Sequence, residues 1–407
     1  MNLRNKTAIV GVGRSDYYKR GGSEPRTITE LAVKAILSAL DDAGLSIEDV
    51  DGFANYSSGG GVEPDLLAQI LGIPELTFTA TLTGGGGGSA ASVGLAGAAI
   101  MSGQASVVVT VLSLQQTSTR FGQIMVEADV RKDETGGQGG YGVQPTAEKD
   151  FIASSGLIGP GQFFALLAQR HMHKYGTKRE HFGEVAISTR NNAMTRETAR
   201  MRTPLTMDQY LSAPIISEPM CLYDFCLETD GAVAVITVSA ERALDLKQKP
   251  AFIKGVAHGG AGRWGQAIAW MGMPEEYFAS SGHRPIAKRL YEIAGVGPQD
   301  IDVALLYDHF TPMVLMQLED YGFCPIGESG SFVADGNIRY GSGSLPVNTH
   351  GGNLSEAYII GMTHLMEGVE QIRGTAVNQV EGAEHALVTG GPASIPVAGL
   401  ILSSSAD

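Results

Sequence analysis

Two stretches of this chain follow the same plan, and that repetition is the feature that most limits the folds open to it. An amphipathic helix is predicted over 27–44, closed by Gly44, and an apolar strand-like segment follows at 52–56. The same order returns with a helix at 285–295 and an apolar segment at 304–307. Because strands and helices of these lengths alternate in wound sheets, we predict an α/β protein built from duplicated halves.

Each predicted half also begins and ends with a short strand. The strand-like runs cover 8–12 and 232–238 in the first half, and 251–256 and 399–403 in the second.

The segment from 115 to 219 departs from this rhythm, because it is polar and rich in glycine between 136 and 142. It is predicted to be an insertion over the active face. The expected units are an N-terminal half (1–114 and 220–245), an inserted loop domain (115–219) and a C-terminal half (246–407).

Charge and cysteine content exclude several classes of protein. The 407 residues carry a formal net charge of −14, whereas nucleic-acid binding needs a basic face, so we expect no nucleic-acid partner.

No apolar run is long enough to span a bilayer and the start lacks a signal-peptide core, so we expect a cytoplasmic protein without membrane insertion. Cys221, Cys226 and Cys324 are too few and too irregular for a disulfide framework or a metal site, and we expect reduced thiols.

Four blocks of sequence carry a family resemblance. The block RHMHKYGTKREHFGEVAISTRNNA (170–193) resembles the inserted segment of sterol-carrier-protein thiolases, a group of the thiolase superfamily. YDHFTP (307–312), NTHGGNLSEAY (348–358) and HALVTGGPASIPVAGLIL (385–402) resemble its HDCF block, its NxxGGxxxxGHP block and its final cysteine-containing glycine turn. The resemblance covers essentially the whole chain. It implies the thiolase fold, five layers in the order αβαβα, and a homodimer.

The cysteines of that family are absent from the matching positions. The nucleophile position falls at Gly86, within TLTGGGGGSAAS, and the final cysteine falls near Thr389. Tyr358 stands where the family has its activating histidine, and Tyr307 stands where it has the histidine of HDCF. Every cysteine-dependent step of a Claisen reaction is therefore expected to be disabled.

Among families with this fold, these blocks most resemble the lipid-transfer-protein aldolases that cleave steroid side chains. The resemblance implies retro-aldol cleavage of a β-hydroxy acyl-CoA with a tertiary alcohol into a ketone and a short acyl-CoA such as propionyl-CoA. It implies no cofactor, because CoA is part of the substrate, and a partner with an OB-fold acyl-CoA-associated domain in a heterotetramer. Thr83 and Gly84 stand where that group tends to carry His-Tyr, which puts the identity of the substrate in doubt.

A retro-aldol step needs a base for the β-hydroxyl proton and donors for the thioester oxygen. We expect Tyr307 to be the acid/base and Tyr358 its partner; the reverse order stays open, as does a purely structural role for both. His309 and His350 flank these positions, and Asp308 is expected to orient His309, although a structural role fits each histidine equally well.

Backbone groups near these side chains are expected to bind the thioester oxygen, although the glycines from 84 to 88 also suit close packing of a helix. The expected binding residues are Gly86, Gly87, Gly351, Gly352, Asn348, Thr389 and Gly390. Two other functions stay open. One is a non-catalytic acyl-CoA or sterol-binding scaffold, and the other is an acyltransferase or hydrolase that uses Ser89 or Thr389 as its nucleophile.

Overall fold

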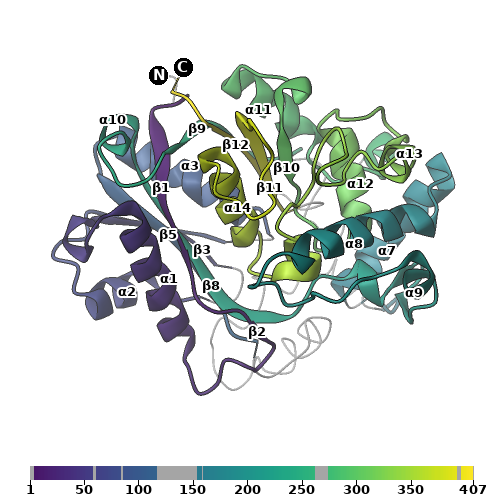
Figure 1. The fold of residues 1–407 in the computed structure, drawn as a ribbon, viewed down its shortest axis with the longest axis horizontal. Helices are drawn as coiled ribbons and strands as arrows, with labels where there is room; N and C mark the ends of the chain where they lie inside the picture. The colour runs from purple at the N-terminus through teal and green to yellow at the C-terminus, as the bar shows by residue number, and fades with distance from the viewer. Residues whose placement is uncertain are drawn as a thin grey trace.

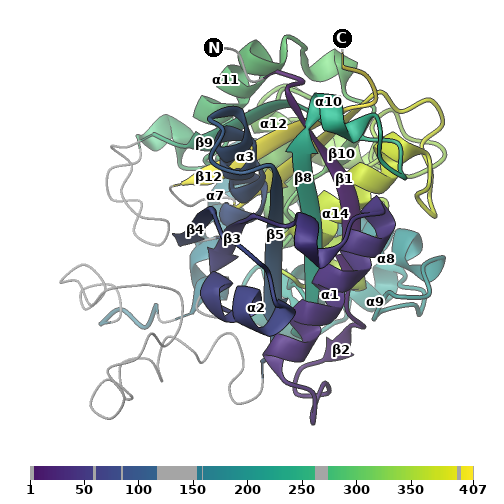
Figure 2. The ribbon, with the colours of Figure 1, turned by 90° about the vertical axis from the view of Figure 1, so that its left-hand side faces the viewer.

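The computed structural model describes residues 4–57, 61–83, 86–116, 154–157, 159–261, 274–391 and 396–406. A long mixed β-sheet runs through its centre, with the strand order β10-β11-β12-β9-β1-β8-β5-β3-β4 (Figure 1). Figure 2 shows β4 at one edge of this sheet. The strands are β1 (Thr7–Arg14), β3 (Gly52–Ser57), β4 (Phe78–Thr83), β5 (Val107–Leu114), β8 (Thr229–Ser239), β9 (Ala251–Gly259), β10 (Val303–Leu305), β11 (His385–Gly390) and β12 (Val397–Ser403). A short β2 (Tyr18–Lys19) pairs with β8, and β6 (Ile215–Ser217) pairs with β7 (Met220–Cys221).

The order of pairings in the sheet repeats. In the first half β3 is parallel to β5, β5 is antiparallel to β8, and β8 is antiparallel to β1. The second half repeats this with β10, β11, β12 and β9 in the same relations. The halves meet where β1 pairs with β9, through Ala8 opposite Phe252 and Ile9 opposite Ala251. The predicted duplication is therefore confirmed.

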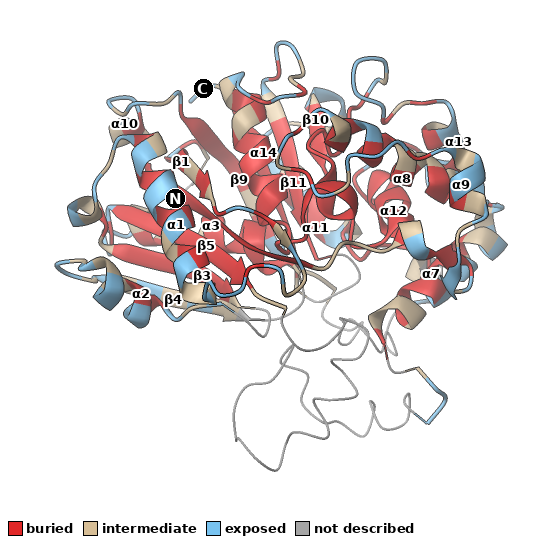
Figure 3. Ribbon diagram, turned by 60° about the horizontal axis from the view of Figure 1, so that its bottom comes forward, coloured by how far each residue is buried: buried red, intermediate tan, exposed pale blue. Residues whose placement is uncertain are grey.

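Helices cover the outer faces of the two halves and fill the space between them. On the outside, α1 (Ile28–Ala43) packs on β1, β5 and β8, and α11 (Arg284–Ala294) packs on β9 and β12. Between the halves, α3 (Gly88–Met101) and α14 (Met362–Arg373) contact strands of both. Figure 3 shows the strands buried and the outer side of α1 exposed. These are the five layers that the resemblance implied.

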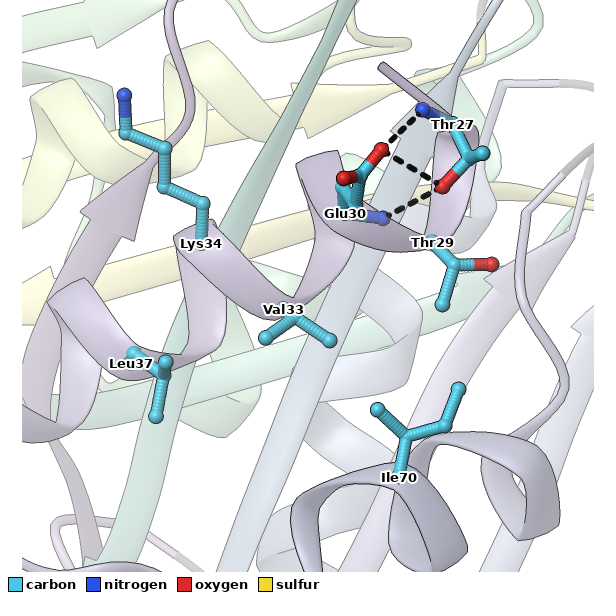
Figure 4. A pocket seen from close by; sticks show the side chains of 7 residues that line it. All are labelled: Thr27, Thr29, Glu30, Val33, Lys34, Leu37 and Ile70. Carbon is cyan, nitrogen blue, oxygen red and sulfur yellow. Dashed lines mark hydrogen bonds between the residues drawn. The ribbon is translucent and has the colours of Figure 1, made fainter.

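The ends of α1 form for the reasons that its sequence gives. The Thr27 hydroxyl accepts a hydrogen bond from the Glu30 amide at 3.2 Å, and the Glu30 carboxylate accepts one from the Thr27 amide at 2.6 Å (Figure 4). This capping box satisfies two N–H groups at the start of the helix. Gly44, at φ 72°, ends the helix in the left-handed conformation that glycine adopts most easily.

The described part of the expected insertion is helical and lies against the C-terminal half. It carries α7 (Pro160–Tyr175), α8 (Arg179–Met194) and α9 (Met207–Leu211). The helix α8 packs on α12 (Thr311–Asp320), α13 (Ser329–Ala334) and the π-helical turn η6 (Gly352–Glu356). The remaining short helices are α2 (Pro64–Leu71) and α10 (Ala240–Ala243). The glycine-rich stretch at 136–142 lies outside the described residues.

Candidate active site

Two tyrosines from separate elements meet at the centre of the molecule. Tyr307 follows β10, and Tyr358 follows η6. Their hydroxyl oxygens lie 3.2 Å apart, within hydrogen-bond distance, and both side chains are buried. The sequence placed these residues at two distinct catalytic positions, and the fold joins those positions into one pair. Hydroxyls in direct contact are able to pass a proton between them.

Buried polar side chains fix the backbone of Tyr307. Its amide donates to Thr389 Oγ1 at 2.8 Å, and its carbonyl accepts from Gln317 Nε2 at 2.9 Å. Thr389 Oγ1 in turn donates to Gln317 Oε1 at 2.6 Å, so the three residues are joined in a closed ring of hydrogen bonds. The Thr389 hydroxyl, expected to bind substrate, is therefore engaged in holding Tyr307. Gln317 was missed from the sequence, because a single glutamine in an apolar helix gives no signal.

Asp308 connects the segments that carry the two tyrosines. Its Oδ1 accepts from the amide of Asn353, in the turn before Tyr358, at 2.8 Å, and from His364 Nε2, on α14, at 2.9 Å. We expected Asp308 to orient His309, but its hydrogen bonds go to η6 and α14 instead. The turn approaches so closely because Gly352 has no side chain; a Cβ there would lie 2.0 Å from Asp308 Oδ2.

His309 lies beside Tyr307, with ring centroids 5.2 Å apart, and packs edge-on against Phe164 of α7 at 4.3 Å. Burial lowers the pKa of His309 to about 3, so the ring is neutral at physiological pH. Within the described part of the chain, His309 Nδ1 has no hydrogen-bond partner. The uncharged His309 ring therefore lies next to the tyrosine pair, and its Nδ1 atom is available for a hydrogen bond.

The other residues expected around NTHGG contact neighbouring protein groups. The ring of His350 packs edge-on against His364, with centroids 4.6 Å apart, and burial lowers its pKa well below the ordinary value. A Cβ on Gly351 would lie 2.6 Å from Ala193 Cβ on α8. Asn348 donates to the Leu306 carbonyl at 2.8 Å. These contacts are with protein groups, and the expected roles of His350, Gly351 and Asn348 in catalysis and binding stay predictions.

The glycines before α3 do lie at the tyrosines. A Cβ on Gly86 would come within 2.5 Å of the Tyr307 hydroxyl oxygen. A Cβ on Gly390 would lie 2.9 Å from the Gly86 carbonyl oxygen, and one on Gly391 would lie 2.2 Å from the Gly87 nitrogen. The first glycine loop and the last glycine turn are thus in backbone contact beside Tyr307, at the N-terminus of α3. Gly84 lies outside the described residues.

A buried ion-pair network supports the turn before Tyr358, and sequence reasoning did not find it. Arg196 Nε lies 2.9 Å from Glu356 Oε1, and Arg196 Nη1 lies 2.8 Å from Glu367 Oε2. Burial raises the pKa of Glu356, and the charge of Arg196 opposes that rise. The feature of the sequence that pointed to this network is the glutamate of EAY, Glu356, two residues before Tyr358.

The described surface carries a hollow in a second place. A hollow between α1 and α2, lined in part by Val33, Leu37 and Ile70, lies on the outer layer and away from the tyrosine pair (Figure 4). Within the described ranges, no group of three or more His, Cys, Asp or Glu side chains is arranged to hold a metal ion. No helix in those ranges has the length and apolar character needed to cross a bilayer.

Buried neutral histidines predict that the protein loses stability in acid. Burial lowers the pKa of both His283 and His309 to about 3, whereas an unfolded histidine titrates near ~6.5. Below pH ~6.5 the unfolded chain therefore binds protons that the folded chain does not, and each site should cost about 2 kcal/mol of unfolding free energy by pH 5. Urea unfolding at pH 7.5 and pH 5 measures the difference in unfolding free energy. Replacing His283 with glutamine should reduce this difference. The same difference in the variant and the wild-type protein would contradict the lowered pKa of His283.

Comparisons with known proteins find relatives of this chain in sequence and in fold. The descriptions "Thiolase, N-terminal domain" and "Thiolase C-terminal domain-like" match residues 7–241 and 269–402. A 17-hydroxy-3-oxo-4-pregnene-20-carboxyl-CoA lyase of Mycobacterium tuberculosis is 40% identical, over 98% of this chain and 100% of that protein. A steroid side-chain-cleaving aldolase of Thermomonospora curvata is 38% identical, over 99% of both chains. A solved structure described as an Ltp2-ChsH2(DUF35) aldolase superposes with a TM-score of 0.87 and 36% identity, over 99% of both chains.

Proposed function

This chain belongs to the thiolase family, and we propose that it is a carbon–carbon lyase in which the Tyr307–Tyr358 pair replaces the family's cysteine chemistry. The proposed reaction is retro-aldol cleavage of a β-hydroxy acyl-CoA. The observation that carries it is the 3.2 Å contact between the two buried hydroxyls. The similar proteins named as a lyase and an aldolase support the same reaction class.

The hydroxyl pair suits a proton relay that leaves no net charge on the protein. In one concerted step, one tyrosine oxygen accepts the β-hydroxyl proton of the substrate and passes its own proton to the other tyrosine, which gives its own proton to Cα, so neither phenol holds two protons. The bond between Cα and Cβ breaks, the β-carbon becomes a ketone, and enolate charge develops on the thioester as the electron pair leaves that bond. The proton from the second tyrosine reaches Cα as this charge develops, which releases the short acyl-CoA. Both phenols end the cycle protonated, so the relay needs no external acid or base.

We propose that the thioester oxygen binds at the start of α3. Negative charge develops on this oxygen as the enolate forms, and the N-terminus of a helix stabilises negative charge through its free N–H groups and its dipole. Gly86 and Gly87 lie there and contact the turn of Gly390. Their lack of side chains lets the thioester approach both the N–H groups and Tyr307.

We propose a CoA-linked steroid side chain with a tertiary alcohol as substrate, cleaved to a ring ketone and propionyl-CoA. The similar lyase and aldolase support this choice, and the wall of Phe164, Phe310 and neutral His309 suits an apolar ring system. Incubating the protein with such a thioester and identifying the products by mass spectrometry tests it. Ketone and acyl-CoA in equal amounts support the proposal. Free CoA would indicate a hydrolase, and binding without turnover would indicate a scaffold.

Thiol chemistry should play no part in the reaction. Cys226 lies close to the site, because its amide donates to the His309 carbonyl at 3.0 Å, but burial raises the pKa of its thiol and of the Cys221 and Cys324 thiols. Few thiolates are then present to react with iodoacetamide near pH 7.5. We expect cleavage to survive brief alkylation and to persist in a variant with all three cysteines changed to serine. Loss of turnover in that variant, with the fold intact, would overturn this expectation.

We also propose that the chain forms a homodimer that binds an OB-fold partner, giving a heterotetramer. The solved structure described as an Ltp2-ChsH2(DUF35) aldolase supports a partner protein. Light scattering on the chain alone and after co-expression with such a partner measures both steps. A dimer that doubles its number of chains on mixing is expected. A monomer with full activity would refute the proposal.

A further inference from the structure

The hydroxyl of Ser89, in the first turn of α3, is buried without a hydrogen-bond partner in the described structure. This is unusual, because most buried polar side chains are paired. Ser92, one turn further along the same helix, is equally buried, and its hydroxyl donates to the Asn55 carbonyl at 3.1 Å. Gly87, which caps the helix, supplies no side-chain hydrogen bond to its N-terminus. Two kinds of donor, backbone and hydroxyl, are thus available at the same end of α3.

Ser89 Oγ faces the space around the tyrosine pair. A Cβ on Gly361 would lie 2.9 Å from Ser89 Oγ and 3.0 Å from Tyr307 Cδ2, so that a single methyl group there would touch both. A Cβ on Gly390 would lie 3.3 Å from the same hydroxyl and 2.9 Å from the Gly86 carbonyl oxygen. Ser89 therefore lies among the glycines and the tyrosine that surround the proposed position of the thioester oxygen.

We propose that Ser89 is a catalytic residue whose hydroxyl donates a hydrogen bond to the thioester oxygen as the enolate forms. This inference rests on the proposed retro-aldol function. The missing partner of the hydroxyl is then the substrate itself, and the helix N-terminus reinforces the same hydrogen bond. Ser89 keeps its proton throughout and forms no covalent bond, because no base contacts its hydroxyl among the described residues.

The test compares Ser89→Ala with Ser92→Ala, the same change one turn along the helix. Removing one oxyanion donor typically lowers kcat on the order of 10²-fold, and we expect that loss for Ser89→Ala with KM changed only a few-fold. Its Tm should stay the same or rise, because an unpaired buried hydroxyl is lost. Ser92→Ala should show the opposite pattern, a lower Tm with unchanged kcat. Wild-type kcat in Ser89→Ala, or a covalent acyl group on Ser89 found by mass spectrometry, would overturn the inference.

A binding measurement separates failure of this inference from failure of the proposed function. Titration calorimetry compares propionyl-CoA with the thioether in which a methylene replaces its carbonyl. Wild-type protein and Ser92→Ala should prefer the thioester, and Ser89→Ala should lose that preference. If no variant cleaves any β-hydroxy acyl-CoA, the proposed function fails, while the preference still decides the role of Ser89. If all three proteins prefer the thioester over the thioether equally, Ser89 does not bind the thioester oxygen.

Discussion

Changing Tyr307 or Tyr358 to phenylalanine should lower the rate of carbon–carbon cleavage on the order of 10²–10⁴-fold while leaving the fold intact. The change removes one oxygen and keeps the ring, so that packing is preserved. Each variant breaks the 3.2 Å contact through which the proton passes. A loss of this size equals roughly 3–5 kcal/mol of transition-state stabilisation.

A structural role for the hydroxyls predicts a different result. Losing one neutral hydrogen bond would cost about 1 kcal/mol of stability and would leave turnover nearly unchanged. The two roles are separated by measuring kcat well below the melting temperature of each variant. The double variant adds a second criterion, because residues that act as one unit are not additive and the second change should cost little more than the first. Early melting with near wild-type cleavage would move the active site elsewhere.

Gly86→Ala should strongly damage the site although it removes no functional group. The new Cβ would lie 2.5 Å from both Cζ and the hydroxyl oxygen of Tyr307, and real Cβ atoms do not approach other atoms so closely. Tyr307 cannot retreat easily, because Thr389 and Gln317 hold its backbone. Its hydroxyl must therefore shift away from Tyr358. We expect kcat to fall about 10²-fold, as for other displacements of a catalytic group by about 1 Å.

Gly97→Ala is the matched control on the same helix. Its Cβ would lie 2.9 Å from the Thr7 hydroxyl, far from the tyrosines, so it adds the same methyl group without touching the site. Overpacking of this kind costs about 1–3 kcal/mol of stability. We expect Gly97→Ala to melt earlier and to cleave at the wild-type rate, and Gly86→Ala to lose cleavage beyond any change in stability. Equal kcat in the two variants would show that Gly86 does not constrain Tyr307.

Local sequence alone determined the elements and their repetition. The capping box of Thr27 and Glu30 and the closing Gly44 set the limits of α1, whereas Pro285 at the start and Gly295 at the end set those of α11. These features could be predicted because each depends on residues a few positions apart. The motifs also located Tyr307, Tyr358 and Gly86, because a family resemblance assigns positions by sequence alignment and needs no knowledge of their contacts.

Only the tertiary structure decided which of those residues face one another. Asp308 precedes His309 in the chain, yet its carboxylate binds the turn of Asn353 and the ring of His364, 45 and 56 residues away. The Thr389 hydroxyl, which was expected to bind substrate, accepts a hydrogen bond from the Tyr307 amide, 82 residues away. Hydrogen bonds between distant segments depend on how the two halves pack. That packing cannot be predicted from which residues are adjacent in the sequence.

The same limit explains what was missed. Gln317 and the Arg196 network carry no motif of their own, and the sequence named Ser89 only as a candidate nucleophile, not as a hydrogen-bond donor. Burial gives each its importance, because a polar group removed from water must find a partner within the protein or in a ligand. The sequence by itself therefore determined the fold, the loss of cysteine chemistry and the two tyrosines. Only tertiary structure decided that the tyrosines touch and which buried groups hold them, because those contacts arise from packing between residues far apart in the chain.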